Sequence, residues 1–145
     1  MVSVASSTAI PPGPDPLSMV AVYVAINALI MLVLGMLVVR ARVRTRTEIG
    51  DGADPALLGP LRAHGNNTEY VPMALLLLLM LLGLQASVGV IHAVGATLTL
   101  GRLLHAYGLT RNVGASMPRL VGMVLTWLSM LIGIAVVLWL ALVGA

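Results

Sequence analysis

The chain has 145 residues, of which 59% are hydrophobic and 9% carry a charge. A soluble domain has about 25% charged residues, so this composition excludes a water-soluble protein and makes the lipid bilayer the main solvent. The absence of cysteine excludes disulfides, thiolate metal sites and a cysteine nucleophile. The net charge is only +3, and we expect no bound metal and no nucleic-acid partner.

The N-terminal segment, residues 1–16, differs in composition from the rest of the chain. It combines four prolines with several serine and threonine residues, which is typical of a flexible tail that ends where a helix begins. It contains no basic residue, so we expect no cleaved signal peptide.

Four apolar stretches follow, at residues 17–40, 61–84, 88–107 and 119–142. A helix needs about 20 apolar residues to cross a bilayer. We therefore predict an all-α integral membrane protein, an up-and-down bundle of four spanning helices in which residues 17–145 form one membrane domain.

Three features predict how these helices are shaped and packed. Pro72 lies inside the second stretch and should kink that helix. Asn27 is the only strongly polar side chain of residues 17–39 and should form an interhelical hydrogen bond. Small residues line one face of the fourth stretch, which predicts close approach to a neighbouring helix. These are Gly122, Thr126, Ser129 and Gly133.

The arginines predict the orientation. All of them lie in the first and third connections or at the helix ends beside these connections. Cytoplasmic loops of membrane proteins are enriched in arginine and lysine. Both termini should therefore lie outside the cytoplasm.

Polar residues are aligned along one face where the second helix begins. Arg62, Asn66, Glu69, Tyr70 and Met73 follow the spacing of a single helical face. Such groups are costly at membrane depth, so they should face protein or a water-filled cavity.

Charged groups of the second and third helices are expected at the same depth. The stretch between Glu69 and Arg102 is uncharged. As one helix it would extend about 48 Å at ~1.5 Å per residue, which exceeds a hydrocarbon core of ~30 Å. It must fold as a hairpin with its turn near Ala86, which places Glu69 level with Arg102 and Asn66 level with His105. We expect a polar pocket here, with Glu69 and Arg102 as a buried ion pair. Its arginines outnumber its carboxylates, which predicts an anionic ligand.

The segment that begins at Arg62, RAHGNNTEYVP, resembles the R-x-x-x-N-x-x-E-Y-x-P signature of the MAPEG family, the membrane-associated proteins in eicosanoid and glutathione metabolism. The resemblance extends over the four-span layout, and GRLLHAYG and PRLVGM are most similar to its bacterial branch. It implies a homotrimer in the bacterial inner membrane that binds glutathione as co-substrate between subunits and uses it on a hydrophobic electrophile.

The resemblance also implies roles for individual residues. Arg119 would be the catalytic residue that stabilises the glutathione thiolate, with Arg111 as the alternative. A free thiol has a pKa of about 8.5, and lowering it by ~2 units requires roughly 2.7 kcal/mol, which a permanently charged guanidinium can supply. The candidate glutathione contacts are Arg40, Arg62, His64, Asn66, Glu69, Tyr70, Arg102 and His105.

Three functions are compatible with these residues. The first is a glutathione transferase or peroxidase. The second is a non-catalytic member of the same family that binds an anionic lipid or thiol ligand, since Leu109 stands where an aromatic residue is expected. The third is a small multidrug transporter that exchanges protons at Glu69, which the arginines disfavour because they would repel cationic drugs.

Overall fold

The computed structural model describes residues 15–143, which contain four α-helices and no strand. The helices are α1 (Pro16–Thr45), α2 (Pro55–Gly83), α3 (Val88–Arg111) and α4 (Met117–Val143). Each is long and apolar enough to cross a membrane. The predicted all-α class with four helices capable of spanning is confirmed.

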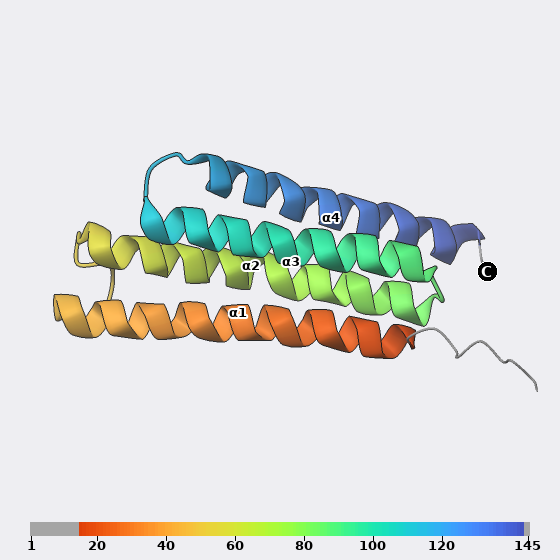
Figure 1. Ribbon diagram of the computed structural model, residues 1–145, viewed down its shortest axis with the longest axis horizontal. Helices are drawn as coiled ribbons and strands as arrows, with labels where there is room; N and C mark the ends of the chain where they lie inside the picture. Colours follow the sequence, from red (N-terminus) through yellow and green to blue (C-terminus); the bar gives the residue numbers. More distant parts are fainter. Residues whose placement is uncertain (1–14, 144–145) are drawn as a thin grey trace, which may run out of the picture.

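The helices lie side by side and alternate in direction (Figure 1). The α1–α2 and α3–α4 connections lie at one end of the bundle and the α2–α3 turn at the other. Within residues 15–143, every pair of helices is in contact except α1 and α4. The bundle is therefore flattened, with α2 and α3 in the middle.

The helix ends are set by local capping. Residues 1–14 of the predicted tail lie outside the described residues, and Pro16 already belongs to α1 because the Asp15 carboxylate caps it by accepting from the Ser18 amide at 3.2 Å. At the other end α1 continues to Thr45, beyond the expected residue 40. Basic side chains favour a helix C-terminus, and Arg42 donates to three carbonyls of the following loop.

The second helix begins at Pro55, before the apolar stretch that starts at residue 61. Asp54 is its N-cap and accepts from the Ala56 amide at 2.8 Å, and a proline at the first position is compatible with a helix start. Pro60 and Pro72 both lie inside α2.

The small-residue face of α4 packs as predicted. The four residues of that stripe are the buried residues of the helix. The Ser129 hydroxyl donates to the Val94 carbonyl of α3 at 2.8 Å. Near the start of the seam, a β-carbon on Gly101 would lie 2.9 Å from the Gly122 carbonyl oxygen. This contact holds the first turns of α4 against the C-terminal half of α3.

The remaining helix surface is strongly apolar. Large hydrophobic side chains such as Leu131 and Trp139 are 63% and 64% exposed. In a bilayer these faces would contact lipid or other protein, because leaving them in water would be unfavourable.

Candidate functional site

A polar cavity of about 140 Å³ lies between α2, α3 and α4. The α2 face supplies two charged groups and an amide, α3 supplies an imidazole, and α4 supplies a guanidinium. Five predicted site residues meet here: Arg62, Asn66, Glu69, His105 and Arg119. Leu61, Gly65 and Leu109 complete the lining.

A larger groove of about 750 Å³ adjoins this polar cavity. The two share Asn66, His105 and Arg119. The rest of the groove is formed by the α3–α4 connection and the start of α4, with the lining residues Val113, Gly114, Ala115, Ser116, Met117, Leu120 and Met123. A charged pocket thus lies next to a space with an apolar wall.

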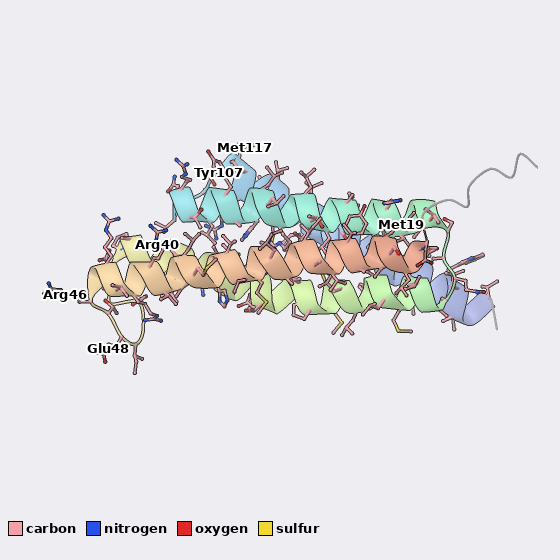
Figure 2. All side chains as sticks on the ribbon, turned by 60° about the horizontal axis from the view of Figure 1, so that its bottom comes forward. Met19, Arg40, Arg46, Glu48, Tyr107 and Met117 are labelled. Atoms are coloured by element: carbon pink, nitrogen blue, oxygen red, sulfur yellow. The ribbon has the colours of Figure 1, made fainter. Side chains whose placement is uncertain are left out.

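Sequence reasoning missed that apolar wall. Met117 and Met123 were not singled out, because apolar residues beside a short polar loop show no periodic pattern. The available signal was the pair of large apolar residues Val113 and Met117, which lie within and directly after a short connection. Figure 2 shows Met117 at the same end of the bundle as Arg40 and Tyr107, with Met19 at the opposite end.

The expected ion pair between Glu69 and Arg102 is wrong for this subunit. Arg102 is buried, at 1% exposure, and its Nη1 donates to the Asn66 side-chain oxygen at 3.0 Å. Its Nε and Nη2 have no partner among the described residues, and Glu69 is exposed. Equal depth does not fix the rotation of a helix about its axis, and Asn66, one turn from Glu69, is the residue that faces α3.

Arg119 is held by the loop before it. Its Nη1 donates to the carbonyls of Val113 and Gly114 at 3.2 and 3.3 Å. A β-carbon on Gly108 would lie 2.6 Å from the Arg119 amide nitrogen, so that glycine permits the close approach of α4. Arg111, the alternative, lies over the Tyr107 ring at 5.4 Å and lines neither cavity.

Besides the buried Arg102, three predicted contact residues do not line the cavities. Arg40 is exposed near the end of α1 (Figure 2). His64 faces α1, where a β-carbon on Gly35 would lie 3.6 Å from its Nε2. Tyr70 is half-buried. None of the three lines either cavity in the single subunit.

The sequence was compared with known families and proteins. The model of the MAPEG family matches residues 20–139. The chain is also 34% identical over 119 residues to the inner membrane protein YecN of Escherichia coli strain K12, covering 82% of this chain and 89% of that protein. The protein of the same name from Escherichia coli O6:H1 matches equally. The chain is therefore a membrane protein that belongs to the MAPEG family.

Proposed function

We propose that this protein is an integral inner-membrane enzyme that uses glutathione to conjugate or reduce hydrophobic electrophiles. The observation that carries the proposal is the composition of the polar cavity, in which Arg62, Glu69 and Arg119 meet an amide and an imidazole. The cavity contains two guanidinium groups and one carboxylate, so its excess positive charge favours a ligand with net negative charge. The inner membrane protein of Escherichia coli that the chain resembles supports the location.

The groups of glutathione fit those of the cavity. A carboxylate of the tripeptide suits Arg62, because guanidinium and carboxylate form strong paired hydrogen bonds, and the second guanidinium, that of Arg119, is left for the thiolate. Its ammonium suits Glu69, and its peptide groups suit Asn66 and His105. The tripeptide supplies the thiol that this cysteine-free chain lacks.

In this proposal Arg119 stabilises the thiolate. It lies at the junction of the polar cavity and the apolar groove, so a thiolate beside it would face an electrophile in the groove. With an aryl chloride, a carbon–sulfur bond forms, the carbon–chlorine bond breaks, chloride leaves and the thiol proton passes to water. With a hydroperoxide, two glutathione molecules are oxidised to the disulfide while the peroxide is reduced to an alcohol and water.

The proposed assembly is a homotrimer with both termini outside the cytoplasm. The exposed apolar faces of α1 and α4 support packing between copies. Such packing would bring the exposed Arg40 of one copy towards the cavity of the next. His64, Tyr70 and Arg102 are retained as members of the proposed binding region, although none lines the cavities of one subunit.

One observation favours the second candidate, a non-catalytic member of the family that binds an anionic lipid or thiol ligand. Leu109 lines the polar cavity, and an aliphatic side chain cannot donate a hydrogen bond to a thiolate. The transporter has less support. Although Glu69 is not paired with Arg102, it shares its cavity with Arg62 and Arg119, which would repel a cationic drug.

The test combines glutathione binding by calorimetry with conjugation of a chlorinated nitrobenzene in proteoliposomes. Arg62→Ala and Glu69→Ala should each weaken binding about tenfold or more, the cost of removing one charged hydrogen-bond partner. Arg44→Ala and Glu48→Ala remove the same charges from exposed positions outside both cavities and should bind as wild type. Binding without turnover would select the non-catalytic candidate, and unchanged binding in both cavity variants would overturn the site.

A further inference from the structure

The side chains of Arg102 and Asn66 form the polar link between α3 and α2 beside the cavity. Arg102 Nη1 lies 3.0 Å from the Asn66 side-chain oxygen and 3.4 Å from its backbone oxygen. A guanidinium has five donors and no acceptor. The atom of the Asn66 carboxamide that faces Arg102 must therefore be the oxygen.

This contact fixes the direction of the other half of the amide. With its oxygen turned to Arg102, Asn66 must direct its NH₂ group elsewhere. Within residues 15–143 the Asn66 nitrogen donates to no protein atom, and it is not enclosed in the protein interior. Asn66 lines both the polar cavity and the groove. Two N–H donors are thus available to a ligand in the cavity.

Arg102 itself does not reach the cavities. It is 1% exposed and lines neither of them. A role that is limited to joining the two helices by a hydrogen bond also explains the burial of Arg102 poorly. Its Nε and Nη2 have no partner among the described residues, and burying a guanidinium with unmet donors is unfavourable. An apolar contact would join the helices at lower cost.

We propose that Arg102 is a positioning residue, which holds the Asn66 oxygen so that the Asn66 amide nitrogen donates to an acceptor group of the ligand. This role rests on the proposed function, and it specifies the chemistry that Asn66 recognises. The group opposite Asn66 is a peptide carbonyl or a carboxylate of the thiol peptide. Its ammonium cannot bind there, because donor would face donor.

The experiment measures glutathione binding to the full-length protein in detergent, with thermal unfolding recorded for every variant. Asn66→Asp keeps the acceptor for Arg102 but replaces the NH₂ group with a second acceptor. Arg102→Lys keeps a donor for Asn66. Asn66→Ala and Arg102→Leu, alone and combined, form a double-mutant cycle. Asn27→Asp is the control, because it makes the same change at a buried amide that is bonded to Thr99 and lines neither cavity.

The expected results follow from donor geometry. Asn66→Asp should weaken binding at least about tenfold, because an acceptor then faces an acceptor. Arg102→Lys should stay within about threefold of wild type, because an ammonium also donates to the Asn66 oxygen. Arg102→Leu should weaken binding about fivefold or more when Asn66 is present and less than about twofold when it is alanine. Asn27→Asp should bind as wild type.

Several results would overturn the role. Equal losses from Arg102→Leu in both backgrounds would mean that Arg102 contacts the ligand directly. If Arg102→Leu lowers the unfolding temperature but leaves the glutathione affinity unchanged, Arg102 serves only to join the two helices. If Arg102→Leu does not fold, the other two variants decide. Unchanged affinity in Asn66→Asp contradicts the proposal, and so does a tenfold loss of affinity in Arg102→Lys. Wild-type protein that binds no glutathione overturns the proposed function itself, and this role with it.

Discussion

Gly122 of α4 lies against the backbone of His105 in α3 so closely that a methyl group on Gly122 would overlap the His105 amide nitrogen. The contact lies beside the two cavities, because His105 and Arg119 line both. Gly122 therefore affects both the packing of α4 on α3 and the geometry of the site. The small-residue face of α4 does more than bring two helices together, since it sets the distance between an imidazole and a guanidinium.

Replacing Gly122 with valine should therefore destabilise the fold and the site together. Overpacking a tight contact costs about 1–3 kcal/mol, and here the clash is with backbone, which cannot rotate away. Thermal unfolding in detergent and glutathione binding would both be measured. Gly89→Ala is the control, because a β-carbon on Gly89 meets nothing within 4 Å. An unfolding temperature for Gly122→Val equal to that of the control would contradict the close α3–α4 contact.

A second link joins α1 to α3 away from the cavities. The Asn27 side-chain nitrogen donates to the Thr99 hydroxyl and to the Tyr23 carbonyl, both at 2.9 Å. Interhelical hydrogen bonds in membranes contribute about 0.6–2 kcal/mol. Asn27→Ala should lower the unfolding free energy by that amount while glutathione affinity stays unchanged. In a cycle with Thr99→Val the two losses should not add, and full additivity would show that the bond contributes nothing.

The cysteine-free sequence makes the proposed orientation directly testable. Ile49, in the α1–α2 connection, is 90% exposed, and Gln85, in the α2–α3 turn, is also exposed. A single cysteine is introduced at either position and intact cells are treated with a membrane-impermeant maleimide. Positive loops remain cytoplasmic, so Gln85→Cys should be labelled and Ile49→Cys protected until the cells are opened. The reverse pattern would show that the termini lie in the cytoplasm.

The sequence predicts how deep a residue lies in the membrane better than it predicts which side of the helix the residue faces. Apolar length is a property of the linear chain, and it identified the four helices. The α4 packing face was identified separately, from the spacing of its small residues. The partner of Arg102 depends on the rotation of α2, which the uncharged stretch after Glu69 does not encode. The sequence predicts that Asn66 lies at the depth of His105 and contacts a ligand, but it does not predict that Asn66 is the partner of Arg102.

The cavity residues were predictable from one motif on α2, from the matched depth of His105 and from the family resemblance that singled out Arg119. Arg62, Asn66 and Glu69 share a helical face and meet at the cavity. His64 and Tyr70 belong to the same segment but lie outside it. The apolar wall around Met117 arises from the path of a loop, for which side-chain periodicity gives no rule.

The choice between Arg119 and Arg111 as the group that stabilises the thiolate is open to a direct test. Arg119 lines both cavities, whereas Arg111 stacks on the exposed Tyr107 ring. Arg119→Ala should raise the pKa of the bound thiol by ~2 units, from about 6.5 to about 8.5, and so lower the thiolate fraction at neutral pH roughly 25-fold. The readout is the ultraviolet absorption of the thiolate, titrated with pH at saturating glutathione. Arg119→Lys keeps the charge and should retain much of the thiolate, and Arg111→Ala should titrate as wild type. A thiol pKa that rises in Arg111→Ala but not in Arg119→Ala would transfer the role to Arg111, and that result would require the α3–α4 connection to rearrange when ligand binds.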